Sequence, residues 1–336
     1  MKRYHYNEKP LQIFGIPFFE ENGKLERLPE KVRKAVPTLD ALGRRALGAR
    51  LCFRTNSKQI NVHLGCKEVD VDLGLSIYQG HSAFVFIGDR PTSYYAGHVF
   101  PKAYGETQAS RIFEKSDKME DITIWLPRNS IVTSLYIEVE DDATVLAPTP
   151  YRYEKPILYY GSSITATGCT RVCNGYNALI SRWLDVDFYN FGFCGSARAE
   201  SEIAEYINSI EKSIFVYDYD HNAPTVEYLE QTHERFFKQI REHDPELPIV
   251  MLSRPNFKMG TDENDEMRRD IIRKTYENAV AQGDNNVYFI DGETLFGDMD
   301  RELCTIDTIH PNDLGFYRMA ERICPVIRTI LEKLNS

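Results

Sequence analysis

The sequence predicts an all-β sandwich domain followed by an α/β domain built on a parallel sheet. Apolar and polar residues alternate with a period of two from about Arg50 to Glu140, which is typical of half-buried strands. A proline-rich stretch, 147–156, follows. After it, apolar runs and helical patterns alternate five times, as expected for strands joined by covering helices. The length of 336 residues is sufficient for two such domains.

The composition excludes several classes of protein. At 42% hydrophobic and 27% charged residues, the chain is typical of folded globular proteins. A net charge of -10 argues against a nucleic-acid partner, which normally requires a basic surface. No apolar run is long enough to cross a bilayer, and the first 24 residues lack the uninterrupted apolar core of a signal peptide. We therefore expect a cytoplasmic protein with no membrane partner.

The first half carries several short strand patterns and almost no helical pattern. Leu51 and Phe53 alternate with polar or small residues, the turn sequence TNSK follows, and a second alternating run covers residues 60–64. This arrangement predicts a hairpin. Further strands are predicted at 82–89, 122–126 and 135–139. Short strands separated by turns indicate a β-sandwich, which we place at residues 1–146.

The stretch APTPYRYEKP, 147–156, contains three prolines. Proline fixes φ and removes a hydrogen-bond donor, so we expect an extended linker there. The second domain is then predicted to cover residues 157–336.

Five apolar runs in this second half have the length of buried strands. In the helical pattern at 225–243, Val226, Leu229, Phe236 and Ile240 fall on one face. Strands and helices in alternation predict a parallel sheet covered on both faces, with ligands bound outside the carboxyl ends of the strands. The five runs are ILYYG (157–161), DFYNFGF (187–193), SIFVYDYD (213–220), PIVMLSRP (248–255) and VYFIDG (287–292).

The first of these runs ends in Gly161-Ser162-Ser163, a sharp turn that places a serine at the edge of the sheet. A serine in this position is either a helix cap or a nucleophile. The G-x-S-x-G elbow of α/β-hydrolases is not matched, because Thr165 stands where its second glycine would be. Neither glycine-rich phosphate-binding motif is present.

The sequence DTIHPND, 307–313, offers a base for such a nucleophile. Asp307 lies three residues before His310, so its carboxylate can accept the Nδ1–H of the imidazole and leave Nε2 as the base. Pro311 disfavours helical geometry at His310 and keeps it on a loop. The alternatives are an Asp and a His that decorate a helix start, or a metal site that includes Cys304, which lacks further clustered ligands.

Two other strand ends offer donors for an oxyanion. Gly195 presents a backbone N–H without a side chain in the way, and Asn222 presents a side-chain amide. Both residue types are also common in ordinary turns. His221 and Cys194 lie beside them and are equally compatible with a core or a pocket wall.

In combination these segments resemble the SGNH (GDSL-type) hydrolases. Residues 161–165 resemble the Gly-Asp-Ser opening of that family, Gly195 its second-block glycine, Asn222 its third-block asparagine, and Asp307 with His310 its Asp-x-x-His. The four blocks occur in order over residues 156–336. The resemblance implies a flavodoxin-like three-layer fold and acyl-ester chemistry without a metal or other cofactor. The β-rich half is similar in placement to the jelly-roll domain of two-domain SGNH carbohydrate esterases and acyltransferases.

The chain departs from the family pattern at two points. The usual aspartate before the nucleophile is Ser162, so two adjacent serines compete for the role, and position matching favours Ser163. The family's Gly-x-Asn-Asp is here Asp220-His221-Asn222-Ala223. We expect Ser162, Asp220 and His221 to line the pocket.

The resemblance implies a catalytic triad of Ser163, His310 and Asp307, with an oxyanion hole formed by the N–H groups of Ser163 and Gly195 and the amide of Asn222. The expected substrate is a small-molecule acyl ester, preferably an acetylated sugar, with a short ester of another small alcohol as the alternative. An acyltransferase using the same triad, and an inert sugar-binding protein on the same scaffold, are the competing functions. The sequence does not specify an oligomeric state.

Overall fold

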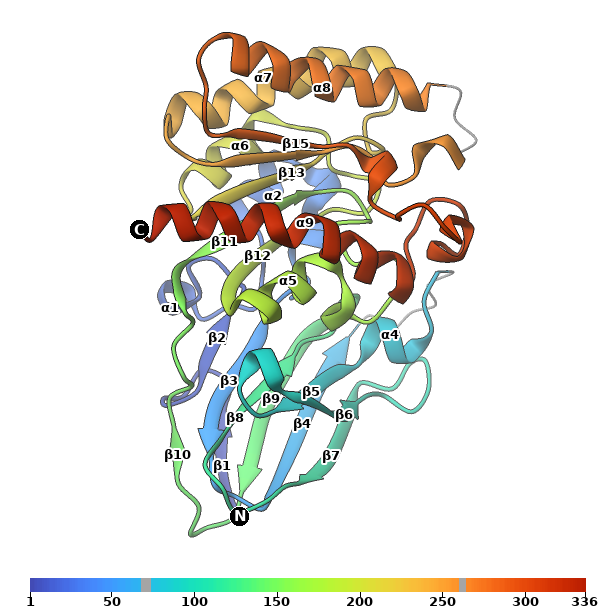
Figure 1. Ribbon diagram of the computed structural model, residues 1–336. Helices are drawn as coiled ribbons and strands as arrows, with labels where there is room; N and C mark the ends of the chain where they lie inside the picture. Colours follow the sequence, from blue (N-terminus) through green and yellow to red (C-terminus); the bar gives the residue numbers. More distant parts are fainter. Residues whose placement is uncertain (68–73, 260–263) are drawn as a thin grey trace.

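The computed structural model describes residues 1–67, 74–259 and 264–336 of the chain. Figure 1 shows the parallel sheet and its helices above a pair of antiparallel sheets. The predicted fold class, a flavodoxin-like α/β domain preceded by a β-sandwich, is confirmed. None of the helices in these three ranges is long and apolar enough to cross a membrane.

The sandwich packs two antiparallel sheets around a shared apolar core. Its smaller helical pieces are α4 (Ile77–His81) and the 3₁₀ turn η2 (Arg90–Thr92). One sheet has the order β1 (Lys2–His5), β9 (Ile131–Val139), β4 (Gln59–Lys67) and β7 (Gln108–Glu114). The other has the order β10 (Val145–Leu146), β3 (Arg50–Thr55), β8 (Glu120–Trp125), β5 (Ala83–Ile87) and β6 (Tyr94–Val99), with β2 (Gln12–Phe14) also paired to β3.

The predicted hairpin between residues 51 and 64 is wrong. Strands β3 and β4 form as expected, but they lie in opposite sheets: β3 pairs with β2, β8 and β10, whereas β4 pairs with β7 and β9. Leu51 of β3 and Val62 of β4 both enter the core between the sheets. Alternation shows which side chains face a core, but the same pattern arises whether two strands pair side by side or face each other across it.

A helical segment near the N-terminus belongs to the core of the other domain, although we expected residues 1–146 to form the sandwich. Leu28, Val32, Val36 and Leu39 pack in the same apolar cluster as Ile203 of the α/β domain. Their spacing of three and four residues is that of one helical face. The segment comprises α2 (Glu30–Ala35), η1 (Pro37–Leu39) and α3 (Asp40–Gly43), whereas Phe19 of the preceding α1 (Phe19–Asn22) packs in the sandwich core.

The second domain contains a five-stranded parallel sheet in the order β12-β11-β13-β14-β15. This is the flavodoxin-like order, in which the direction of winding changes on either side of the first strand, β11. The strands are β11 (Tyr153–Gly161), β12 (Val186–Gly192), β13 (Ile214–Asp218), β14 (Ile249–Leu252) and β15 (Val287–Ile290).

Strand β11 begins at Tyr153, inside the segment that we expected to be a linker. Its pairing with β12 is interrupted between Tyr153 and Ile157, so Pro156 occupies a stretch where that ladder needs no N–H from it. The carbonyl of Pro156 still accepts the N–H of Ser213 at 2.8 Å.

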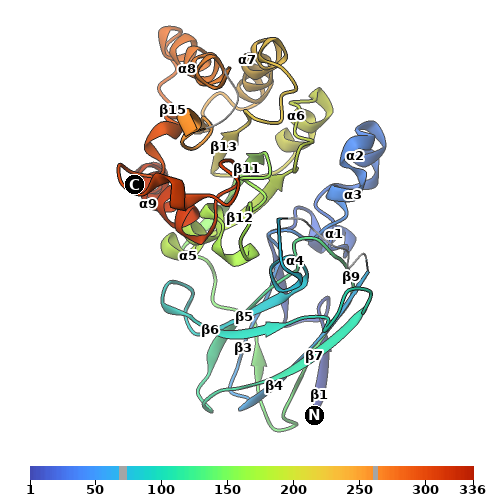
Figure 2. The same ribbon diagram turned by 90° about the vertical axis from the view of Figure 1, so that its right-hand side faces the viewer.

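Helices cover both faces of the parallel sheet, as Figure 2 shows. The helices α5 (Tyr176–Leu184) and α9 (Asp313–Leu334) share one apolar cluster with the sheet, and α6 (Ser201–Asn208), α7 (Val226–His243) and α8 (Asp265–Ala281) share the other. Caps fix two of the starts: Thr225 accepts the Tyr228 N–H at 3.1 Å, and Asn312 accepts the Gly315 N–H at 3.1 Å. The connecting 3₁₀ turns are η3 (Val172–Asn174), η4 (Phe257–Met259), η5 (Gly292–Thr294) and η6 (Arg301–Cys304).

The two domains are joined by a buried interface. Trp125 and Phe84 of the sandwich pack in the same apolar cluster as Phe188 of β12. Arg50 of β3 forms a buried ion pair with Asp187, and Arg90 Nε donates to Asp185 Oδ1 at 2.5 Å. Apolar burial combined with paired charges indicates a fixed arrangement of the domains.

Candidate active site

Ser163 lies two residues beyond the carboxyl end of β11, the strand at which the winding direction changes. Gly161 ends that strand level with Gly192 of β12 and Asp218 of β13. A Cβ on Gly161 would lie 2.1 Å from the carbonyl oxygen of Asp218, so only glycine permits this close approach of two strands. The chain therefore turns sharply and leaves Ser163 half-buried at the edge of the sheet.

Ser163, His310 and Asp307 form one hydrogen-bonded chain. The Ser163 Oγ lies 2.8 Å from His310 Nε2, and His310 Nδ1 lies 2.6 Å from Asp307 Oδ2. The other carboxylate oxygen of Asp307 accepts the backbone N–H groups of Ile309 at 3.0 Å and His310 at 2.7 Å. The structure thus brings together the three residues that the sequence singled out, across a separation of 147 residues.

Hydrogen bonds keep Asp307 ionised. Partial burial raises the pKa of its carboxyl, but the bonds from the His310 ring and from the backbone N–H groups of His310 and Ile309 outweigh it and hold the pKa below its ordinary value. An ionised Asp307 accepts a hydrogen bond from the Nδ1–H of His310, which leaves Nε2 as the acceptor facing Ser163.

The two adjacent serines have different environments. Ser162 is only 2% exposed, and its Oγ accepts the N–H of Ile164 at 3.1 Å. It is a buried turn residue, so the structure differs from our expectation that it lines the pocket. Of the two hydroxyls, that of Ser163 contacts the imidazole.

The three N–H donors expected to form an oxyanion hole follow neighbouring strands of the sheet. Among the residues that the structure describes, the backbone N–H groups of Ser163 and Gly195 and the Nδ2 of Asn222 have no acceptor. They follow β11, β12 and β13, which are adjacent in the sheet. Asn222 is oriented by its Oδ1, which accepts the Ala197 N–H at 3.2 Å. Gly195 has a φ of +70°, and a Cβ there would meet nothing within 4 Å, so the approach to its N–H is open.

Asp220, which we expected to line the pocket, is buried at the end of β13. It is 3% exposed, and its Oδ2 accepts the backbone N–H of Arg254 at 3.0 Å. Burial raises its pKa to about 6, although that N–H and the charge of Arg268 oppose the shift. Its role is to tie the end of β13 to the end of β14.

His221, which we expected to line the pocket, lies close to Arg254, Arg268 and His310. Burial, together with the positive charges of Arg254 and Arg268, lowers its pKa well below the ordinary value, so its ring is neutral. The Nε2 of His221 is enclosed and has no hydrogen-bond partner.

The sequence analysis did not single out Asp218, whose carboxylate supports the turn that carries Ser163. Its Oδ2 accepts the hydroxyl of Thr165 at 2.7 Å and that of Tyr176 at 3.3 Å. The carbonyl of Thr165 also accepts the amides of Asn177 and Asn190, each at 2.9 Å. Burial raises the pKa of Asp218 to about 7, although the Thr165 bond opposes it.

The sequence analysis also did not single out Arg254, which connects β14 to the loop that carries His310. This side chain is 2% exposed and forms an ion pair with Asp265 Oδ2 at 2.5 Å. Its Nη2 donates to the carbonyl oxygen of Thr308, between Asp307 and His310, at 3.2 Å. A charged residue at the end of a predicted strand was the available signal, because that edge of a parallel sheet faces the site.

Among the residues that the structure describes, no three His, Cys, Asp or Glu side chains lie close enough to hold a metal ion. All seven cysteines are free thiols.

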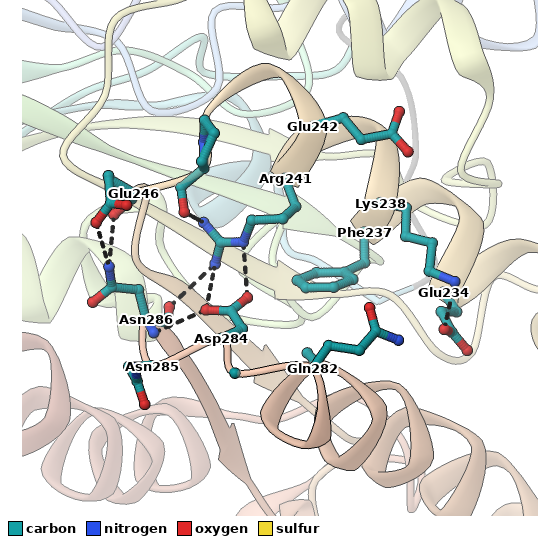
Figure 3. Close-up of a pocket in the computed structure, with 13 residues that line it drawn as sticks. Glu234, Phe237, Lys238, Arg241, Glu242, Glu246, Gln282, Asp284, Asn285 and Asn286 are labelled. Atoms are coloured by element: carbon teal, nitrogen blue, oxygen red, sulfur yellow. Dashed lines mark hydrogen bonds and ion pairs between the residues drawn. The ribbon is translucent and has the colours of Figure 1, made fainter.

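A separate hollow lies between the C-terminal ends of α7 and α8 (Figure 3). It is near the residues that begin β14 and β15, so it opens at the edge of the sheet opposite Ser163. Arg241, which lines this hollow, donates hydrogen bonds to Asp284 at 2.8 Å and to the carbonyl of Leu247 at 2.6 Å. This hollow is therefore not connected to the Ser163–His310 pair.

Comparison with known proteins identifies the family. Residues 154–328 match the model of the GDSL-like lipase/acylhydrolase family, and residues 2–145 match the model of the N-terminus of SGNH-hydrolase-type esterases. The first match covers more than half of the chain. A search of curated proteins finds no match.

Solved structures share the whole two-domain arrangement. A protein of Bacteroides ovatus ATCC 8483 described as a GDSL-like lipase is 25% identical, with a TM-score of 0.87 over 98% of both chains. The salicylyl-acyltransferase SsfX3 from a tetracycline biosynthetic pathway is 20% identical, with a TM-score of 0.79 over 98% of this chain and 97% of that chain.

A family two carbohydrate esterase from Cellvibrio japonicus is 13% identical, with a TM-score of 0.63 over 99% of this chain and 98% of that chain. The resemblance inferred from the four sequence blocks is confirmed, and with it the assignment as an SGNH-type hydrolase. The chain belongs to the GDSL-like lipase/acylhydrolase family.

Proposed function

We propose that the protein is a serine esterase that removes a short acyl group, acetyl, from a carbohydrate alcohol through a covalent acyl-enzyme. The observation that carries this proposal is the Ser163 Oγ to His310 Nε2 contact of 2.8 Å, next to three N–H donors that lack acceptors among the described residues. A nucleophile, a base and an oxyanion site at one strand edge are what acyl transfer requires.

In the first half-reaction, Ser163 Oγ attacks the ester carbonyl carbon while His310 Nε2 takes the hydroxyl proton. The oxyanion that forms is stabilised by the N–H groups of Ser163 and Gly195 and by the Asn222 amide. His310 then gives its proton to the leaving alcohol oxygen as the C–O bond breaks. Asp307 stays ionised throughout and stabilises the imidazolium.

In the second half-reaction, water attacks the acyl-enzyme and His310 takes its proton. Collapse of the tetrahedral intermediate releases the carboxylic acid and returns the proton to Ser163 Oγ. If an alcohol replaces water in this step, the same residues perform acyl transfer. The likeness to the fold of a salicylyl-acyltransferase makes that outcome worth measuring.

Two features support a sugar ester as the substrate. The site is open, because Ser163 is only half-buried and Gly195 is exposed. The fold is shared with proteins described as carbohydrate esterases, one of them in complex with cellohexaose. A half-buried nucleophile at the edge of the sheet suits a bulky alcohol with a small acyl group better than a long acyl chain, which needs an apolar tunnel.

The test is acetate release from acetylated monosaccharides and from p-nitrophenyl acetate, with Ser163→Ala as the control. We expect turnover by the wild type and a loss of about 10⁴-fold or more in kcat for the variant. A second series adds an acceptor alcohol and measures the acylated acceptor, which separates hydrolysis from transfer. Binding of sugars without turnover of any ester would instead support the inert sugar-binding alternative.

A further inference from the structure

The turn that carries Gly195 is surrounded by arginines from the N-terminal region. Arg128, in the segment after β8 of the sandwich, crosses the domain interface, and its Nη2 lies 3.4 Å from the Sγ of Cys194. Arg27 donates to the carbonyl of Gly192 at 2.9 Å, and its guanidinium lies over the ring of Phe193, 4.9 Å from the centroid. The sandwich thus places positive charge one residue from an expected oxyanion donor.

These charges are not neutralised by the described part of the chain. Arg27, Arg45 and Arg128 form no ion pair with a carboxylate among the residues that the structure describes. The four acceptors of Arg27 are all backbone carbonyls. Burial, with smaller contributions from the positive charges of Arg45 and Arg128, lowers the pKa of Arg27 to about 9, although Cys194 opposes the shift.

The nearest acidic group on this turn is engaged elsewhere. Glu200 accepts the backbone N–H of Arg198 at 3.3 Å. The side chain of Arg198 donates to the carbonyl of Gly195 at 3.5 Å. Arg27, Arg45 and Arg128 therefore form a local excess of positive charge in a protein whose net charge is -10.

Arg128 differs from the arginines that hold the domains together. Arg50 pairs with Asp187, and Arg90 binds Asp185 and the carbonyls of Thr149 and Pro150. Arg128 is 6% exposed, yet its Nε has no partner and its Nη2 meets only a thiol, which is a weak acceptor. A buried guanidinium that pairs with no carboxylate carries a free-energy cost that an incoming anion would reduce.

We propose that Arg128 binds a carboxylate group of the substrate beside the oxyanion hole. The inference rests on the proposed function and refines its substrate class: the ester carries an ionised acid close to the scissile bond. That acid belongs either to the alcohol, as in an acetylated uronic acid, or to the acyl group, as in a succinyl half-ester. A guanidinium forms charge-assisted hydrogen bonds with a carboxylate in both cases.

The experiment compares kcat/KM for acid and neutral members of two matched pairs. The alcohol-side pair is O-acetylated glucuronic acid and its methyl ester, followed by acetate release. The acyl-side pair is p-nitrophenyl succinate and p-nitrophenyl butyrate. Each pair is measured with the wild type, Arg128→Met, Arg128→Lys and the control Arg44→Met, which removes an exposed charge paired with Asp40.

For the wild type we expect the acid to be preferred in one pair, and Arg128→Met to reduce that preference by about 10- to 100-fold, the range expected for a charge-assisted bond. Arg128→Lys should retain part of the preference, and Arg44→Met all of it. The pair that responds identifies which side of the ester carries the acid. Melting temperatures show whether the variants are folded.

Three results would overturn the inference. One is a wild type that prefers the neutral member of both pairs. Another is a preference unchanged in Arg128→Met, including the case in which both activities fall together, because Arg128 would then only support the turn. The last is calorimetry in which neither glucuronate nor succinate binds the wild type more tightly than Arg128→Met. That binding measurement needs no turnover, so absence of esterase activity would contradict the proposed function without deciding this inference.

Discussion

The guanidinium of Arg254 donates to the carbonyl oxygen of Thr308 at 3.2 Å, and this bond fixes the turn between Asp307 and His310. Thr308 has a φ of +71°, a conformation that a β-branched residue rarely adopts. The backbone N–H of Arg254 is in turn held by Asp220. The position of the imidazole thus depends on the ends of two strands, β13 and β14, that contribute no nucleophile or base.

Replacing Arg254 with lysine keeps the buried positive charge but cannot supply both the Asp265 and the Thr308 contacts, because an ammonium lacks the planar fork. We expect kcat to fall about 10- to 100-fold through misplacement of His310, with KM nearly unchanged. Arg269→Lys is the matched control, since Arg269 pairs with Asp291 and does not contact the turn. Normal kcat in folded Arg254→Lys would refute this positioning role.

Asp307→Asn should preserve the turn, because an amide oxygen can still accept the two backbone N–H groups. The amide NH₂ would then face Nδ1 and favour the tautomer that protonates Nε2. We expect kcat for p-nitrophenyl acetate to fall about 10³- to 10⁴-fold, with little change in KM. A loss smaller than tenfold would show that Asp307 does not set the tautomer.

Asn222→Asp should remove an oxyanion donor while keeping the bond from Ala197 to Oδ1. The expected result is a loss of about 10²-fold or more in kcat, because the donor acts mainly on the transition state. Steady-state kinetics and a thermal melt are measured together. If KM rises and kcat holds, Asn222 contacts the ground state of the substrate instead.

Asp218 should make the protein less stable as the pH rises. Its pKa is about 7 in the fold and near 3.8 when unfolded, so between these values the folded state binds more protons and the free energy of unfolding decreases with pH. The loss amounts to at most about 4 kcal/mol between pH 4 and 7. Asp218→Asn should flatten this profile in urea titrations, and identical slopes for both proteins would contradict the assignment.

Gly161→Ala should destabilise the fold by more than about 3 kcal/mol, since the new methyl group would overlap the Asp218 carbonyl. Gly283→Ala is the comparison. That glycine has a φ of +89° with nothing within 4 Å of a Cβ, so only the backbone strain of about 1–2 kcal/mol applies. Equal urea midpoints for the two variants would mean that the strands can separate at Gly161.

Local patterns predicted much of the fold. Strands with period two and the five apolar runs are each visible within a few residues, and the structure confirms strands at these places. Pairing is not local: β3 and β4 are consecutive in the sequence but lie in opposite sheets. The placement of Leu28 and Val32 in the core of the second domain likewise depends on contacts far along the chain.

Part of the candidate site also follows from local spacing in the sequence, and the rest depends on contacts between distant segments. Asp307 and His310 are three residues apart, so their contact follows from spacing, whereas the contact of His310 with Ser163 was inferred from a family motif. Asp218 and Asp220 look alike in the sequence, as charged residues at the end of one strand. Which of them supports the nucleophile turn depends on Thr165 and Tyr176, which come from other segments.

The most direct test of the account is labelling with a fluorophosphonate, followed by intact-mass measurement and peptide mapping of the wild type, Ser162→Ala and Ser163→Ala. The account predicts one adduct on Ser163, retained in Ser162→Ala and lost in Ser163→Ala. An adduct on Ser162, or no adduct on folded protein with a reagent that labels a control hydrolase, would contradict the claim that Ser163 is the activated nucleophile.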